Sequence, residues 1–391
     1  MTGQTSLVPK RRFKAFQNTH AWEQRKLGEV CCIGDIDHRM PPSVLVGIPY
    51  VMTGDFIENN AIDFENAKCI SEEDYEQLSR KIKPEKGDIL FARYASVGTV
   101  RYIEDNRKFL ISYSCVILKH TEDIEGKYLY CYLQTDVAQQ QIELEINTGS
   151  QRNIGIDSLK NNIVVSVPKI DEQIQIIDFF TNLDHLITLH QRKLEKMKAL
   201  KSAYLSEMFP AEGESEPKRR FAGFTDAWEQ RKVIDIAPLQ RGFDLPVSEM
   251  EAGSYPVIMS NGIGAYHSKY KAKAPGVVTG RSGTIGNLTF VEADYWPHNT
   301  ALWVTDFKGN DAKFIYYLYQ KLDLKRYGTG SGVPTLNRND VHDTIASIPS
   351  VAEQKQISRL FDHLDHLITL HQRKLEKLQN IKKAYLNEMF V

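Results

Sequence analysis

The fourteen residues LDHLITLHQRKLEK occupy positions 183–196, and the same fourteen letters return at positions 364–377. The match continues beyond both copies, as AYLSEMF at 203–209 and as AYLNEMF at 384–390. Self-similarity of this kind at a fixed offset indicates an internal duplication. The chain of 391 residues is therefore expected to consist of two related halves.

A second repeated string, AWEQRK, stands at 21–26 and at 227–232, each time preceded by Arg-Arg-Phe. Each half also carries Pro-x-x-x-Glu-Gln just before its fourteen-residue string, from Pro168 and from Pro349. Between these anchors the similarity is weak but ordered. This pattern indicates that the repeated segments keep one structural role while the parts between them have diverged to recognise different targets.

The repeated segments are predicted to form long helices. The stretch from Asp171 to Met208 holds no Pro or Gly, and it begins with acidic residues. Its apolar positions, like those of the second copy, recur every 3.5 residues, which predicts a coiled coil. The proposed interface positions are Phe180, Leu183, Ile187, His190, Leu194, Met197, Phe361, Leu364, Ile368, His371, Leu375 and Leu378.

Each helix should be roughly 55 Å long at about 1.5 Å per residue. Because the second helix must return from the second globular part, we expect an antiparallel pair and a pseudo-two-fold internal repeat. We interpret His190 and His371 as polar residues that set the register of the pair, rather than as a metal site or a proton switch.

The segments before the helices mix short β-rich runs with Gly- and Asn-rich turns and one helical stretch each, so the predicted fold class is α+β. Two tandem α+β domains would be separated by the two helices. The expected division is a first domain at 1–168, a helix at 169–209, a linker at 210–218, a second domain at 219–349 and a helix at 350–391.

The composition, with 42% hydrophobic and 25% charged residues, is typical of a soluble globular protein. No membrane-spanning run or signal peptide is recognisable, so a cytoplasmic location is expected. The five cysteines contain no C-x-x-C pair and are expected to be reduced structural thiols, with no zinc site. Since the formal net charge is −1, any nucleic-acid contact must come from local clusters of Lys and Arg.

Several loops combine Arg or Lys with small polar residues. Glycine lets a backbone approach a phosphate closely, and Arg can pair with a guanine edge. Arg93 and Arg281 are distinguished by their equivalent places in the two copies. The alternative for each residue is a solvated side chain or a structural turn, and Trp22 and Trp228 are interpreted as packing anchors. The candidate DNA-binding residues are Arg39, Arg93, Tyr94, Ser96, Ser150, Arg152, Arg241, Lys269, Lys271, Lys273, Arg281, Ser282, Thr284, Ser331, Asn337 and Arg338.

This ordered set, present twice, resembles the DNA-specificity subunits of type I restriction–modification systems over essentially the whole chain. The resemblance implies two target-recognition domains, each recognising one half of a bipartite asymmetric site in double-stranded DNA. It implies helices that dock two methyltransferase (modification) subunits and set the spacer, with two translocase–nuclease (restriction) subunits added for cleavage. S-adenosylmethionine, ATP and Mg would belong to those partners, and no cofactor is expected in this chain.

Other functions remain open at the level of the sequence. A stand-alone methyltransferase would need a cofactor-binding Gly-rich turn and an Asn- or Asp-Pro-Pro-aromatic tetrapeptide, and Met40-Pro-Pro-Ser43 is not that tetrapeptide. A phosphate loop for ATP is also missing from the sequence. The remaining alternatives are a coiled-coil adaptor that binds only proteins, and an RNA-binding protein.

Overall fold

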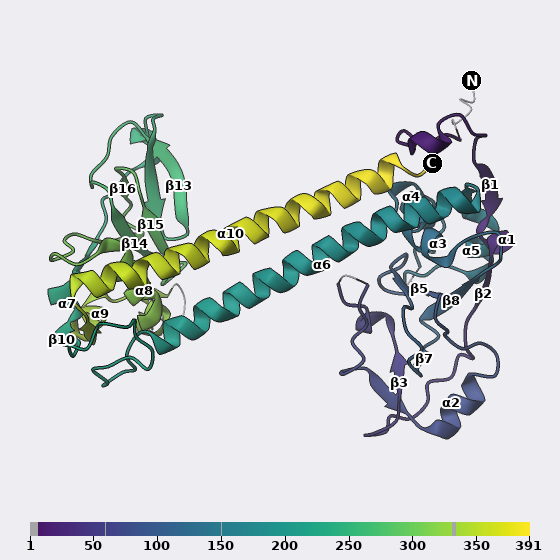
Figure 1. Cartoon of the computed structure of the whole chain (residues 1–391), viewed down its shortest axis with the longest axis horizontal. Helices are drawn as coiled ribbons and strands as arrows, with labels where there is room; N and C mark the ends of the chain where they lie inside the picture. Colours follow the sequence, from purple (N-terminus) through teal and green to yellow (C-terminus); the bar gives the residue numbers. More distant parts are fainter. Residues whose placement is uncertain (1–6, 59, 150, 331–333) are drawn as a thin grey trace. The chain divides into compact units, whose positions relative to one another are not determined.

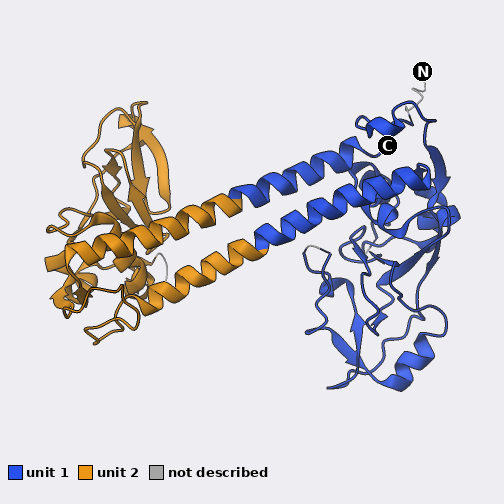
Figure 2. Cartoon of the chain, viewed as in Figure 1, with its two compact units in different colours: residues 1–191, 373–391 blue, residues 192–372 orange. Residues whose placement is uncertain are grey.

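The computed structural model describes residues 7–58, 60–149, 151–330 and 334–391. The chain divides into two compact units, which Figure 2 shows in different colours. Unit 1 comprises Met1–Gln191 and Arg373–Val391, and unit 2 comprises Arg192–Gln372. The division therefore lies inside each of the two repeated segments, and each unit contains a stretch of both.

Unit 1 is built on two small sheets, of which β2, β8, β5, β3 and β7 are labelled in Figure 1. A four-stranded antiparallel sheet has the order β2-β8-β5-β6, with β2 (Cys31–Gly34), β8 (Cys115–His120), β5 (Ile89–Ala92) and β6 (Val100–Tyr102). A three-stranded sheet has the order β4-β3-β7, with β4 (Lys68–Ile70), β3 (Ile48–Val51) and β7 (Leu110–Ile111). All four residues of β5 are buried, as expected for a strand with apolar side chains on both faces.

The remaining elements of unit 1 cover these sheets. β1 (Glu23–Lys26), which contains most of the AWEQRK string, pairs antiparallel with β9 (Val164–Val167). The short helices are α1 (Leu27–Val30), α2 (Glu72–Leu78), α3 (Gly126–Tyr132), α4 (Asp136–Leu144) and α5 (Ile156–Asn162). Helix α3 buries six of its seven residues, so it belongs to the core rather than to the surface.

Unit 2 repeats this plan. Its larger sheet has the order β11-β17-β14-β15, with β11 (Leu239–Arg241), β17 (Ala301–Val304), β14 (Gly276–Gly280) and β15 (Leu288–Val291). Its smaller sheet has the order β13-β12-β16, with β13 (Gly262–His267), β12 (Tyr255–Met259) and β16 (Trp296–Pro297). Two further pairs are β10 (Glu229–Lys232) with β20 (Ile345–Ile348), and β18 (Gly328–Thr329) with β19 (Thr335–Leu336). Its short helices are α7 (Val233–Ile236), α8 (Ala312–Leu322) and α9 (Arg338–Asp343).

The two long helices are α6 (Ile170–Glu207) and α10 (Val351–Glu388), with 38 residues each. Within unit 1 their segments are antiparallel: Asp184 pairs with Lys382 at 2.7 Å, and the earlier Phe180 contacts the later Phe390 at 5.9 Å between ring centroids. Within unit 2 the equivalent pair is Lys201–Asp365 at 2.6 Å. The expected fold class, two mixed helix–sheet domains with two long helices, is confirmed.

The heptad positions differ in burial. Phe180, Leu183, Ile187, Leu194, Phe361 and Leu364 are buried. The other six proposed interface positions are partly exposed, namely His190, Met197, Ile368, His371, Leu375 and Leu378. The most buried members lie where a helix segment joins the core of its unit, since Phe180 belongs to the core of unit 1 and Phe361 and Leu364 belong to that of unit 2.

The other repeated motifs fasten each domain to its helix. Arg12, from the Arg-Arg-Phe motif, bonds Glu172 at the start of α6 with 2.7 Å between Nε and Oε1, and Arg220 bonds Glu353 at the same distance. Gln173 accepts a hydrogen bond from the backbone of Glu125, as Gln354 does from Asp311. Trp22 and Trp228 are buried in the two cores, which confirms their role as packing anchors.

Candidate nucleic-acid interface

In unit 1, four loop segments meet at the end of β5: residues 35–39, 93–98, 112–114 and 147–154, without residue 150, which lies outside the described residues. We call them the first loop cluster. The turn after β5 is held by backbone hydrogen bonds from Arg93 N to Ser114 O at 2.9 Å and from Ile154 N to Arg93 O at 3.1 Å. Ala95 and Gly98 both have left-handed backbones, with φ of 57° and 88°, and so return the chain sharply into β6.

The side chain of Arg93 is turned into unit 1. It is 8% exposed, its Nη1 lies 2.9 Å from Asp35 Oδ2, and its Nε donates to Ile154 O at 3.1 Å. Asp35 also accepts hydrogen bonds from Lys81 at 2.9 Å and His38 at 3.3 Å. Burial favours the neutral form of Asp35, but the hydrogen bonds from Lys81 and His38 and the charge of Arg93 prevail and lower its pKa. The expected DNA-contacting arginine therefore occupies a buried ion pair.

Three rings lie beside this ion pair. His38 and Tyr113 are stacked, with centroids 5.2 Å apart and planes 20° apart, and Tyr94 meets Tyr113 edge-on at 6.2 Å. His38 is exposed, and both tyrosines are partly exposed. The tyrosine hydroxyls and the imidazole nitrogens can hydrogen-bond to phosphates or base edges, and the rings offer apolar contact surface.

In unit 2, the second loop cluster consists of residues 241–244, 281–286, 298–300 and 329–338, apart from those outside the described residues. Its backbone bonds match those of the first cluster: Arg281 N donates to Thr300 O at 2.9 Å, and Leu336 N donates to Arg281 O at 2.7 Å. Gly283 and Gly286 have left-handed backbones at the places of Ala95 and Gly98. Gly280 allows no larger residue, because an added Cβ would lie 1.9 Å from Thr284 O.

The two clusters thus share one hydrogen-bonded scaffold and carry different side chains. Tyr94 and Ser282 form the corresponding bridges, to Asn153 and to Thr335. The tripeptide Ser112-Tyr113-Ser114 corresponds to His298-Asn299-Thr300, since Ser112 O and His298 O accept from Cys115 N and Ala301 N. Where Tyr113 stacks on His38, Asn299 instead donates to Asp244. The backbone is the same in the two clusters and the side chains differ. This arrangement is expected of two binding sites for different targets.

The structure places the other candidates of unit 1 as follows. Arg39 bonds Asp74 at 2.7 Å, and Arg152 bonds Glu143 at 2.7 Å, so both guanidinium groups have a carboxylate partner. Tyr94 and the exposed Ser96 lie on the same turn as Arg93. Ser150 lies outside the described residues, as does Ser331 of unit 2.

In unit 2, Arg241, Arg281, Ser282 and Thr284 lie in the second loop cluster. Arg241 reaches Asp244 at 3.4 Å, and both side chains are largely exposed. Asn337 caps α9 by accepting from Asn339 N at 3.1 Å, and Arg338 is exposed beside it. Within the described part of the chain, neither Arg281 nor Arg338 has a carboxylate within ion-pair distance.

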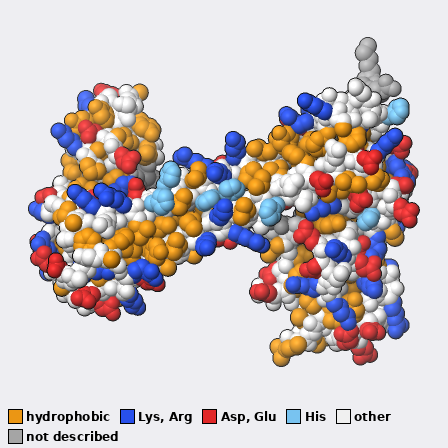
Figure 3. All heavy atoms as spheres, viewed as in Figure 1, with side chains coloured by type: hydrophobic (Ala, Val, Ile, Leu, Met, Phe, Trp, Pro, Cys, Tyr) orange, Lys and Arg blue, Asp and Glu red, His pale blue; other side chains and the backbone are white. Residues whose placement is uncertain are grey.

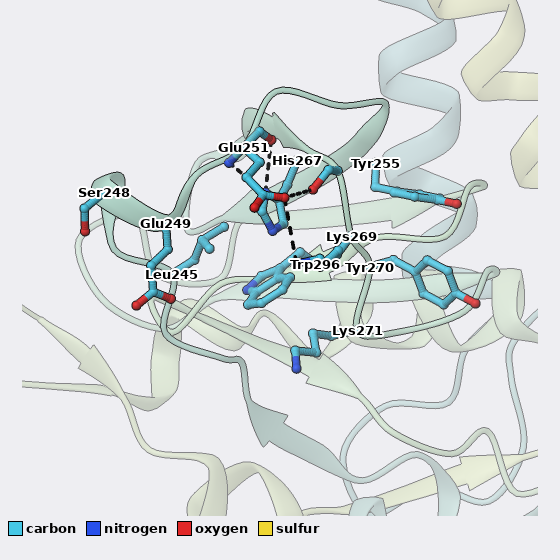
Figure 4. Close-up of a pocket in the computed structure, with 11 residues that line it drawn as sticks. Leu245, Ser248, Glu249, Glu251, Tyr255, His267, Lys269, Tyr270, Lys271 and Trp296 are labelled. Atoms are coloured by element: carbon cyan, nitrogen blue, oxygen red, sulfur yellow. Dashed lines mark hydrogen bonds and ion pairs between the residues drawn. The ribbon is translucent and has the colours of Figure 1, made fainter.

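The three candidate lysines lie apart from the loop cluster, in or near a groove of about 790 Å³ in unit 2 (Figure 4). Its aromatic lining includes Tyr255, Tyr270 and Trp296. Lys271 Nζ lies 5.1 Å from the Trp296 ring centroid and 5.7 Å from that of Phe243, and Lys269 is 3.8 Å from Glu251. Phe243 belongs to the second loop cluster, so Lys271 lies between the groove and that cluster. Lys273 is exposed and does not line the groove.

Sequence reasoning missed Asp35, Tyr113, Asp244 and Asn299, and it named the loop of His38 without assigning that residue a role. The available signal was spacing: Asp35 and His38, like Arg241 and Asp244, are three residues apart at the end of the first strand of each sheet. Figure 3 shows acidic and basic side chains interspersed on the visible face of each unit, which agrees with the balanced net charge.

Two further searches cover the described residues. They contain no group of three or more His, Cys, Asp or Glu side chains that could hold a metal ion. None of their helices has the combination of length and apolar character that crossing a membrane requires. The five cysteines form no disulfide, and burial raises the pKa of the Cys115 thiol to about 12.

The sequence matches the type I restriction modification DNA specificity domain over residues 20–199 and 225–380. It is 22% identical over 332 residues to a putative type I restriction enzyme MjaX specificity subunit from Methanocaldococcus jannaschii, covering 77% of each chain. It is 21% identical over 341 residues to the type I restriction enzyme EcoprrI specificity subunit from Escherichia coli, covering 82% of this chain and 80% of that one.

Solved structures support the same fold. The S subunit of a type I restriction–modification system from M. genitalium matches with a TM-score of 0.68 and 16% identity, over 98% of this chain and 99% of that chain. A chain from a structure of type I R-M complex assembly matches with a TM-score of 0.55, over 94% and 97%. The family match over both halves, together with the two-domain, two-helix fold, defines a DNA-recognition protein of the specificity type. The chain belongs to the type I restriction–modification specificity subunit family, whose members are in general non-catalytic.

Proposed function

We propose that this chain is the subunit that selects the DNA sequence for a type I restriction–modification complex, with each unit recognising one half of a bipartite, asymmetric site. The observation that carries the proposal is the pair of loop clusters: one backbone scaffold supports His38, Tyr94 and Tyr113 in unit 1, and different side chains in unit 2. A protein that recognises two different half-sites needs this combination of a common frame and distinct contact groups.

The contact residues proposed for unit 1 are Arg39, Tyr94, Ser96 and Arg152, and Arg93 holds the turn in place. Those proposed for unit 2 are Arg241, Lys269, Lys271, Lys273, Arg281, Ser282, Thr284, Asn337 and Arg338. Catalysis, S-adenosylmethionine, ATP and Mg are assigned to the partner subunits. Helices α6 and α10 would dock two modification subunits and set the spacer between half-sites, and two restriction subunits would complete the nuclease.

The experiment is genome-wide mapping of methylated adenine in an unmethylated host that expresses the cognate modification subunit with or without this chain. An asymmetric two-part motif that requires this chain would support the proposal and identify both half-sites. If a soluble complex forms and no new motif is found, the protein does not select DNA in this way.

Binding measurements distinguish the two remaining alternatives. Association with duplex DNA should weaken with salt, with a log–log slope of about −0.9 per contacted phosphate. A protein-only adaptor would bind neither duplex DNA nor RNA. An RNA-binding protein would prefer an RNA of the same sequence and charge.

A further inference from the structure

The strand registers place Asp35 and Arg241 at the same position of the two larger sheets. In unit 1, Ala92 is opposite Cys115 and Gly34 is opposite Ile117, so Asp35 follows at the place opposite Val116. In unit 2, Gly280 is opposite Ala301 and Arg241 is opposite Leu302. Because Cys115 and Ala301 correspond, so do Val116 and Leu302, and with them Asp35 and Arg241.

The charges at this position and three residues later are reversed. In unit 1 the acid is Asp35 and the basic group is His38, with 3.3 Å between Nε2 and Oδ2. In unit 2 the basic group is Arg241 and the acid is Asp244, at 3.4 Å. The neighbouring arginine is retained in both, as Arg93 and Arg281. Arg93 therefore pairs with an acid in unit 1, whereas in unit 2 the position equivalent to that acid holds a second arginine.

This exchange changes what each arginine can bind. The side chains of Arg93 and Asp35 are each 9% exposed, and the guanidinium also donates to a backbone carbonyl, so little of it is left for another ligand. Arg241 is 52% exposed, and its contact with Asp244, which is 72% exposed, is long and solvent-screened. Arg281 has no carboxylate partner among the described residues. Unit 2 thus presents two arginines that can donate to a ligand.

We propose that Arg241 and Arg281 together bind a hydrogen-bond acceptor of duplex DNA. In unit 1 the ion pair with Asp35 keeps Arg93 from binding DNA in this way. The acceptor is a backbone phosphate or a guanine edge, which present the same chemistry to a guanidinium. Unit 1 contacts its half-site through the exposed His38 and the partly exposed Tyr94 and Tyr113, beside Arg39, Ser96 and Arg152. This inference rests on the proposed function and names the DNA groups that unit 2 binds.

The test measures binding of the full chain to a duplex containing both half-sites over a series of salt concentrations. For Arg241→Ala with Arg281→Ala, two lost phosphate contacts would reduce the log–log slope by about 1.8. If the acceptor is a guanine edge, the slope stays nearly constant and discrimination at one G·C pair falls by roughly 5- to 150-fold. Arg231→Ala, an exposed arginine of β10 paired with Glu229, is the matched control.

The unit 1 arm uses Arg93→Gln with Asp35→Asn, which replaces the ion pair by neutral hydrogen-bonding groups and is checked for folding by its melting temperature. Its salt slope should equal that of the wild type. A slope lowered as much as that of the unit 2 variant would overturn the inference, as would a unit 2 variant with unchanged slope and unchanged discrimination. Failure of the wild type to bind DNA at all would instead remove the proposed function.

Discussion

Phe390, the residue before the last in the chain, packs edge-on against Trp22, with ring centroids 6.3 Å apart. Phe209, at the end of α6, contacts Trp228 in the same way at 6.2 Å. Each unit therefore completes its core with the end of a helix that begins in the other unit. Both copies of the string that ends AYL-x-EMF thus supply a buried phenylalanine, Phe209 or Phe390, to the core of a unit.

The first prediction concerns these two buried phenylalanines. Phe390→Ala should destabilise unit 1 by about 3 to 5 kcal/mol, because a large buried side chain is lost and a cavity remains. Phe209→Ala should have a similar effect on unit 2. Hydrogen–deuterium exchange resolved by peptide measures each unit separately, and loss of protection in the opposite unit would contradict the assignment.

The two equivalent arginines should differ in their contribution to stability. Arg93→Ala leaves Asp35 buried with only Lys81 and His38 and should cost about 3 kcal/mol, at the low end for a broken buried pair. Arg281→Ala removes a partly exposed side chain without a carboxylate partner among the described residues and should change stability by less than about 0.5 kcal/mol. Urea unfolding of both variants provides the comparison; equal losses would be inconsistent with the different environments.

The ion pair also predicts a pH dependence. The pKa of Asp35 is lowered in the folded chain, so the unfolded chain binds the proton more readily. The stabilisation by this carboxylate is complete above the ordinary Asp pKa of about 3.9 and is lost as the pH falls below that value. Asp35→Asn should flatten the loss of unit 1 stability as the pH falls below about 3.9. An equally steep loss in that variant would assign the effect to other carboxylates.

The turn after the central strand allows a reciprocal test. Ala95 has φ of 57°, whereas its counterpart Gly283 has φ of 81°. Ala95→Gly should stabilise unit 1 by up to about 1 kcal/mol by removing left-handed strain, and Gly283→Ala should destabilise unit 2 by about 1 kcal/mol. Thermal melting of both variants checks the signs, and two changes of the same sign would show that the turns differ.

The proposed spacer role of the helices predicts an effect on the DNA site. Inserting one heptad into both α6 and α10 keeps the seam in register. If the helices set the gap, the methylated motif should keep both half-sites and change the number of unspecified bases between them. Methylation mapping of the variant provides the measurement, and an unchanged gap would argue against this role.

The repeat made most of the fold predictable. The stretch without Pro or Gly and its heptad predicted α6 to within a residue at each end, and the alternating runs predicted mixed domains. The sequence could not reveal that Arg93 is turned inward, because its partner Asp35 is 58 residues away and approaches it only through pairing of β2, β8 and β5. For the same reason Tyr113 was missed: its stacking partner lies on a different loop.

The unit boundaries lie within the two identical fourteen-residue strings, after Gln191 in one and after Gln372 in the other. Both boundaries separate a Gln from an Arg, so a chain running from Gln191 directly into Arg373 would contain no unfamiliar junction. It would contain every residue of unit 1, but the identical string would continue α6 as one helix, so Phe390 would take the place that Phe209 has in the present chain and would not reach Trp22. A chain shortened by recombination between the two strings would therefore need the helix end of a second chain to complete the core of unit 1. The identical strings thus allow halves of two such chains to be joined with no new sequence at the junction.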